Sequence, residues 1–218
     1  LAADLTLADS NTGTTEVTSM AGNALSITAD AAAGNLTVDA ADLAEDTDLT
    51  LVGGANGKTA TVNNLVGDVV ASTLDSVLTV NLADADNNDI SITTGTFTTS
   101  VLGSAADDTV SVIATAMADD VLLTTAGAGE FTITDLKGNL SNTAAGPNSV
   151  TLADNDDGDY TITSSTAITV NNGTAQVGDD VTLAGAGNKT VTALAADLTL
   201  ADSNTGTTEV TSMAGNAL

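Results

Sequence analysis

Short runs of alternating apolar and polar residues recur along the whole chain. Leu5–Leu7, Leu36–Val38, Val110–Val112 and Ile168–Val170 each place a Thr or Ser between two apolar residues. Apolar residues at i and i+2 are typical of a half-buried β-strand, and the Asp, Asn and Gly clusters between the runs are typical of turns. The one Ala-rich stretch, Ala29–Ala33, is too short to form a helix. The pattern predicts an all-β chain with roughly one strand per eleven residues.

The chain contains an unchanged repeat of its own beginning. Residues 1–25 recur at 194–218, which gives a period of 193 residues. Tandem modules of nearly identical sequence explain such a recurrence better than chance or functional constraint on a long polar segment. We therefore expect residues 1–193 to form one module and residues 194–218 to begin the next, identical one.

Weaker internal similarity indicates how the strands are arranged. The run V-T-L-A begins at Val150 and again at Val181, and a T-x-T run begins at Thr161 and again at Thr190, so the spacings are 31 and 29 residues. These spacings predict a parallel β-solenoid (β-helix) with three strands and about 30 residues per coil, each coil burying a narrow apolar face against the next. A two-sided coil of about 20 residues is the alternative. A β-sandwich array is less favoured, because it needs longer strands and bulkier core residues.

Three sub-units recur within the module. Each contains an apolar strand, a Gly-rich turn and a T-x-T strand, and each is followed by a leucine, at Leu65, Leu136 or Leu194. The Gly-rich turns at 53–58 and 185–189 lack the spacing and the positive field of a phosphate-binding loop. We expect them to be tight turns in which glycine adopts positive φ.

Composition and charge narrow the function classes. The chain has 29 Asp and Glu residues against 3 Lys and Arg, a net charge of −26, 42% hydrophobic residues and only 1% aromatic residues. Patterned β-branched residues favour ordered thin layers over disorder, despite the charge. The charge argues against nucleic acid as a partner, and no apolar run approaches the ~18 residues of a membrane span. Because His, Cys and Arg are absent, we expect no enzymatic activity.

Two acidic turns that follow Leu-Ala-Asp form the pattern D-x-D-x-[NG]-D. The candidate metal ligands are Asp84, Asp86, Asn88 and Asp89 in the first turn, and Asp154, Asp156, Asp157 and Asp159 in the second. Oxygen ligands at alternate positions next to a small turn residue are how proteins wrap Ca²⁺. No Glu stands at the closing position of an EF-hand, so further ligands must come from a neighbouring coil. The alternative is that these residues serve only as good turn formers.

Residues 66–96 and 104–136 resemble the repeats of giant, acidic, Thr-rich surface proteins of Gram-negative and cyanobacterial genomes, many of which are similar to type I secreted calcium-binding adhesins. The resemblance covers most of the module. The G-G-x-G-x-D nonapeptide of haemolysin-type repeats is absent, so their calcium roll is not carried over. The resemblance implies an extracellular or cell-surface location and an adhesive or fibre-forming role.

Together these observations predict a structural repeat of an extracellular surface fibre, filament or sheath, stabilised by Ca²⁺. The alternative is the stalk of a giant cell-surface adhesin whose binding domain lies elsewhere. Near-identical modules favour the fibre, because a uniform filament needs uniform units. The expected partners are other copies of the module, end to end or laterally, together with polysaccharide or a cell surface. We expect no membrane insertion.

Overall fold

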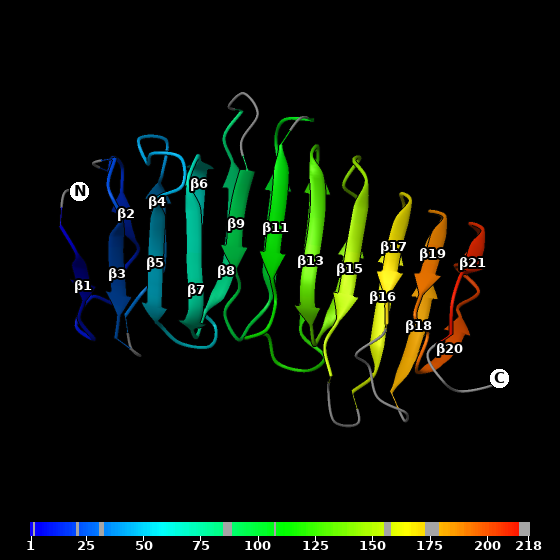
Figure 1. Cartoon of the computed structure of the whole chain (residues 1–218). Helices are drawn as coiled ribbons and strands as arrows, with labels where there is room; N and C mark the ends of the chain where they lie inside the picture. Colours follow the sequence, from blue (N-terminus) through cyan, green and yellow to red (C-terminus); the bar gives the residue numbers. More distant parts are fainter. Residues whose placement is uncertain are drawn as a thin grey trace.

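The computed structural model describes residues 1, 3–20, 22–30, 33–84, 89–106, 108–154, 158–172 and 179–213. Within this part the chain forms two long parallel sheets and no helix (Figure 1). The odd sheet consists of β1 (Leu5–Leu7), β3 (Leu25–Ala29), β5 (Asp48–Gly53), β7 (Asp68–Leu74), β9 (Asp89–Thr93), β11 (Thr109–Ile113), β13 (Glu130–Leu136), β15 (Asn148–Leu152), β17 (Ile168–Asn171), β19 (Lys189–Thr192) and β21 (Thr208–Val210). The even sheet consists of β2 (Thr15–Val17), β4 (Leu36–Asp39), β6 (Thr59–Leu65), β8 (Val77–Leu82), β10 (Thr99–Gly103), β12 (Leu122–Gly127), β14 (Asn139–Asn142), β16 (Tyr160–Ser164), β18 (Asp180–Ala184) and β20 (Asp197–Leu200). The prediction of an all-β parallel solenoid is confirmed.

Each coil contains two strands, one in each sheet. Stacked residues lie 17 positions apart at Leu123 and Leu140 and 24 apart at Leu25 and Leu49, so the coil has about 20 residues. The three-strand coil is therefore wrong, and the two-sided alternative is right. The spacing of 31 residues is not the length of one coil. Val150 lies in β15 and Val181 lies in β18, three strands later and in the opposite sheet. It corresponds to one and a half coils.

The core is a single thin layer between the sheets. In β8 the residues alternate strictly, so that Leu78, Val80 and Leu82 are buried while Thr79 and Asn81 lie at the surface. The buried residues form one cluster that runs through the stack. The two largest fully buried side chains are Tyr160 and Phe131. Apolar residues of modest size fill such a layer, which explains a stable fold with few aromatic residues.

The recurring leucine of each sub-unit marks a corner. Asn64, Asp135 and Ala193, which directly precede these leucines, have positive φ values of 53°, 54° and 52°. The strand register shifts between Val62 and Leu65 and likewise between Ile133 and Leu136. A residue in the left-handed region adds a bulge, and this bulge directs the leucine back into the core.

The Gly-rich turns behave as expected where the structure tests them. Gly53, Gly54, Gly57 and Gly185 have φ values between 77° and 87°, which non-glycine residues rarely adopt. At Gly187 the requirement is close approach, because an added Cβ would overlap the carbonyl oxygen of Thr166 in the preceding coil. Glycine at these positions therefore permits the tight stacking of coils.

Candidate functional site: the acidic edges and the open end

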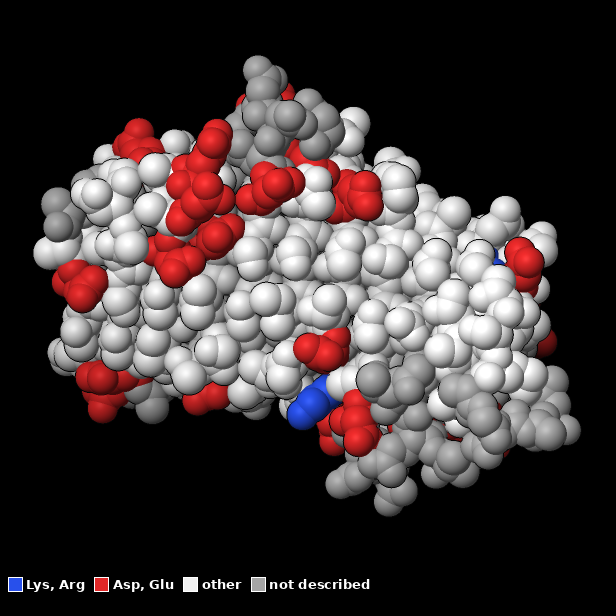
Figure 2. Space-filling view, in the orientation of Figure 1, with Lys and Arg blue, Asp and Glu red and all other residues white. Residues whose placement is uncertain are grey.

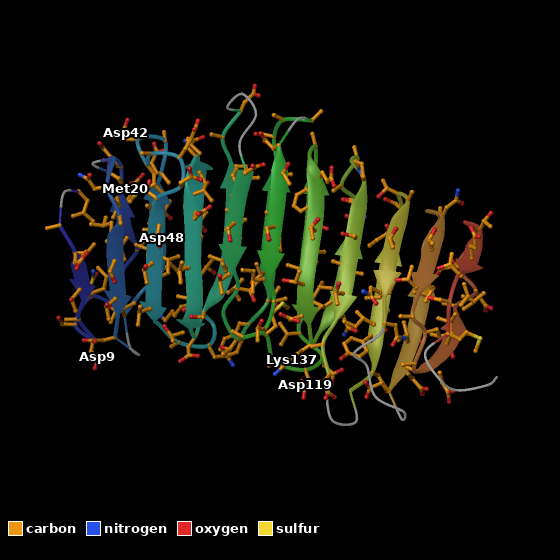
Figure 3. The ribbon with its side chains drawn as sticks, viewed as in Figure 1. Asp9, Met20, Asp42, Asp48, Asp119 and Lys137 are labelled. Carbon is orange, nitrogen blue, oxygen red and sulfur yellow. The ribbon has the colours of Figure 1, made fainter. Side chains whose placement is uncertain are left out.

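The turns between the sheets form two edges of the solenoid. We call the edge made by turns from an even strand to the next odd strand the upper edge, and the opposite edge the lower edge, as drawn in Figure 1. Asp42 lies at the upper edge, whereas Asp9, Asp119 and Lys137 lie at the lower edge (Figure 3). Strand faces carry uncharged ladders between these edges. The even sheet, for example, stacks Thr37, Thr61, Thr79, Ser100, Thr124, Ser141 and Thr163 in register.

The two predicted calcium turns lie on opposite edges. Asp84 lies in the turn between β8 and β9 and Asp89 begins β9, at the upper edge, whereas Asp154 and Asp159 lie in the turn between β15 and β16 at the lower edge. The other four candidate ligands, Asp86, Asn88, Asp156 and Asp157, lie outside the described residues. The two turns are seven strands apart, so they cannot share ligands.

Calcium coordination stays a prediction. Among the described residues, no group of three or more Asp, Glu, His or Cys side chains is placed to hold a metal ion. Coordination at either turn would therefore need Asp86 and Asn88, or Asp156 and Asp157, together with the described carboxylates.

Tyr160 anchors the second acidic turn. Its side chain is fully buried, and its hydroxyl donates a hydrogen bond of 2.6 Å to the carbonyl oxygen of Ala153, at the other end of the turn. Burial raises the pKa of this hydroxyl, and the negative charges of Asp179, Asp119 and Asp154 raise the pKa further. The sequence analysis did not single out Tyr160. The structure adds that the three carboxylates come from three lower-edge turns, those between β11 and β12, β15 and β16, and β17 and β18.

At the upper edge, carboxylates are stacked on neighbouring strands. Asp48 of β5 and Asp68 of β7 are register partners. An oxygen of Asp68 accepts a hydrogen bond of 2.7 Å from the backbone N–H of Ser91. Burial raises the pKa of Asp68 and outweighs this hydrogen bond, which lowers it. The charges of Asp48 and Asp46 raise the pKa further. Figure 2 shows acidic side chains gathered at the upper edge over the first half of the solenoid.

We expect Asp68→Asn to raise the melting temperature at pH 7 in low salt. The amide oxygen can still accept from Ser91, while the like-charge repulsion and the cost of burying a charge are removed. The pKa of Asp68 is raised in the folded chain, so its ionisation destabilises the fold as pH rises above the ordinary carboxyl value of 3.8. The gain should therefore vanish below that pH. Thermal unfolding followed by circular dichroism at pH 3 and pH 7 checks both results, and a lower melting temperature at pH 7 would contradict them.

Lys189 is a buried cation. The sequence analysis had placed it only in the Gly-rich turn at 185–189. Its Nζ donates to the carbonyl oxygens of Gly185 at 2.8 Å and Gly187 at 2.6 Å, and burial lowers its pKa. Asn148 occupies the corresponding position two coils earlier, where its Nδ2 donates hydrogen bonds to the carbonyl oxygens of Ala144 and Gly146. Lys189 therefore holds its turn closed from the inside instead of presenting its charge to solvent.

The last coil ends in an apolar hollow. Leu194, Leu198, Leu200, Val210 and Met213 line it, together with Thr211 and Ser212. Leu200, Val210 and Met213 are among the few large apolar side chains that are exposed in the described chain. In the first copy of the repeat the corresponding residues, Leu7, Val17 and Met20, are buried, so this hollow is a surface that a further coil of the stack would cover. We call this surface, made by β20, β21 and Met213, the open end.

Comparison of the chain with known protein families, with curated proteins and with solved structures found no match. In the described part of the chain, no helix has the length and apolar character needed to cross a membrane.

Proposed function

We propose that this chain is a structural repeat of an extracellular surface fibre, filament or sheath. The continuous stack carries this proposal: residues 194–218 repeat residues 1–25, and their strands β20 and β21 pair in register with β18 and β19, so the second copy of the repeat prolongs both sheets without a break. A solenoid of this kind grows by adding coils, because each coil contacts only its neighbours.

The acidic edges support a role for divalent cations in this fibre. Carboxylates crowd the turns, and the pKa of Asp68 is raised first by burial and further by the neighbouring charges of Asp48 and Asp46. Self-repulsion of this kind opposes the compact state unless cations screen it. Ca²⁺ suits oxygen ligands, and the Asp84–Asp89 and Asp154–Asp159 turns are the proposed places for direct coordination.

The second candidate is the stalk of a cell-surface adhesin. The resemblance to the repeats of acidic bacterial surface proteins favours it. In both cases the chain acts as a rod, at the cell surface, in contact with other copies or with polysaccharide. The fibre differs from the stalk in requiring that modules associate with each other.

Electron microscopy of the concentrated chain tests the fibre. We expect end-to-end filaments from the unmodified chain and their loss in the Leu200→Lys variant, because a charge at the open end resists burial. Leu102→Lys is the matched control: Leu102 is 47% exposed on the face of the even sheet and Leu200 is 52% exposed at the open end. A monodisperse monomer at high concentration would count against the fibre and leave the stalk as the better proposal.

A further inference from the structure

A buried asparagine interrupts a column of leucines at the lower edge. Leu136 of β13 and Leu152 of β15 are register partners at this corner, and the pairing of β15 with β17 brings Asn172, the residue after β17, to the same level. Leu194 follows β19 in the next coil. All four side chains are buried. Asn172 is therefore polar where the neighbouring coils place leucine, and apolar packing does not explain it.

The amide of Asn172 lacks the partners that a buried amide needs. Asn172 is 0% exposed, and neither its Oδ1 nor its Nδ2 has a hydrogen-bond partner among the described residues. Asn142, by contrast, accepts a hydrogen bond from Thr125 and donates one to Ser164. Buried polar groups of native folds are satisfied by protein, ordered water or a bound ion. The Asn172 side chain therefore indicates a ligand at this corner.

Polar groups of two successive coils surround this position. Asp179, at the other end of the turn that Asn172 begins, is only 1% exposed. In the preceding coil, the Tyr160 hydroxyl donates to the carbonyl oxygen of Ala153, the residue after Leu152. Burial raises the pKa of Tyr160, and Asp179 is the strongest of the charges that raise it further. The carboxylate of Asp179 therefore lies near this hydroxyl.

The charge of the corner favours a cation as the ligand. Asp154 directly follows Ala153 at the surface, and its charge acts on Tyr160 as well. The turns at 153–159 and 172–179 contain no Lys or Arg. Amide, carboxylate and backbone carbonyl oxygens are the ligands that Ca²⁺ prefers, and its flexible coordination completes the set with water. A water molecule alone would satisfy the amide without offsetting the negative charge.

We propose that Asn172 and Asp179 bind a divalent cation of the Ca²⁺ type between two successive coils, with oxygens of Ala153 and Asp154 supplied by the preceding coil. This set contains two carboxylates, which agrees with the observation that no three acidic side chains of the described chain are placed to hold a metal. The inference rests on the proposed role of cations at the second acidic turn, and it names the ligands that the neighbouring coil contributes.

An ion at this place would act as a clamp between coils. The stability of a solenoid depends on the interfaces between neighbouring coils. At Leu136 and Leu152 the corner is held by apolar packing, whereas at Asn172 a polar side chain replaces that packing. The ion would tie the turn at 172–179 to the turn at 153–159 across this interface. The interface between the β15–β16 coil and the β17–β18 coil therefore depends on cations, while the interface at Leu136 does not.

Terbium luminescence tests the site, because Tyr160 is the single tyrosine and the chain has no tryptophan. Tb³⁺ takes the oxygen ligands of Ca²⁺, and it luminesces when an excited tyrosine close to it transfers energy. Excitation at a wavelength that phenylalanine does not absorb restricts the signal to ions near Tyr160. We titrate the unmodified chain and the variants Asn172→Leu, Asp179→Asn and Asp119→Asn. Asp119→Asn is the matched control, since its charge also acts on Tyr160 but lies outside the proposed ligands.

We expect a saturable signal that Ca²⁺ displaces, about tenfold weaker Tb³⁺ binding in Asn172→Leu and Asp179→Asn, and unchanged binding in Asp119→Asn. Leucine continues the column, so Asn172→Leu should melt no lower than the unmodified chain in the absence of cations. Circular dichroism checks this, and shows that lost binding is not lost folding. Equal weakening in all three variants would show diffuse attraction to the edge and would overturn the inference.

Absence of the signal from the unmodified chain would also overturn the inference, because it would leave water as the ligand of Asn172. The melting temperature then separates the two proposals. If chelation lowers it although no signal appears, cations screen the edges without this site. If chelation has no effect either, the proposed role of cations fails together with the site.

Discussion

Phe131→Ala should lower the free energy of unfolding by about 3–5 kcal/mol, the usual cost of removing a fully buried phenylalanine ring. Phe131 is 0% exposed and lies in β13, between Val110 of β11 and Asn148 of β15. The core is one layer thick, so few side chains can move to fill the space. The cavity should remain largely open.

The same substitution should also change how the chain unfolds. In a solenoid each coil contacts only its neighbours, so a weak coil near the middle uncouples the two halves. We expect urea unfolding, followed by circular dichroism, to separate into two transitions in place of one. Leu102→Ala is the control: Leu102 lies on nearby β10 but is 47% exposed, so its loss should change stability by less than about 0.5 kcal/mol. A single transition with little loss of stability would contradict continuous stacking through β13.

Chelation of divalent cations in low salt should lower the melting temperature by ten degrees or more, on the order of 3–5 kcal/mol of stability for a chain of this size. The net charge is −26, of which residues 194–218 contribute three acidic charges and no basic one, so one module carries −23. Nine and a half coils at about 4.8 Å make the module about 46 Å long, or about one negative charge per 2 Å. Duplex DNA, which condenses counterions, carries one per about 1.7 Å.

Added Ca²⁺ should restore the melting temperature at millimolar concentration, where sodium at the same concentration does not. Replacing Asp154 and Asp156 by Asn should remove part of this response. Replacing Asp119 and Asp120 by Asn removes the same charge from the same edge and serves as the matched control. A larger loss in the first variant indicates coordination at the turn, whereas equal losses indicate screening alone. If chelator leaves the melting temperature unchanged in low salt, the role of cations in the fold is wrong.

Local features of the sequence determined the elements of this fold. The alternation at Val110–Val112 and Ile168–Val170 was sufficient to predict β11 and β17, because period 2 places one side of a strand in the core. Gly53 and Gly185 were predicted at positive φ, because glycine lacks the Cβ that forbids it. The parallel solenoid followed from short strands at regular intervals in a chain with few aromatic residues. The recurrence of residues 1–25 is likewise a fact of the sequence.

Only the tertiary structure decided how many strands close a coil. Strands of both sheets carry the same inward apolar alternation, so Val150 and Val181 look equivalent although they lie in opposite sheets, one and a half coils apart. Closure depends on corners such as Asn64 and Asp135, whose effect accumulates over many residues. The two-strand coil then determines the rest: the acidic turns after Leu82 and Leu152 fall on opposite edges, and the 19 strands of one period place β20 in the sheet opposite β1. The parity of a strand count is a property of the closed coil, and no local pattern of residues encodes it.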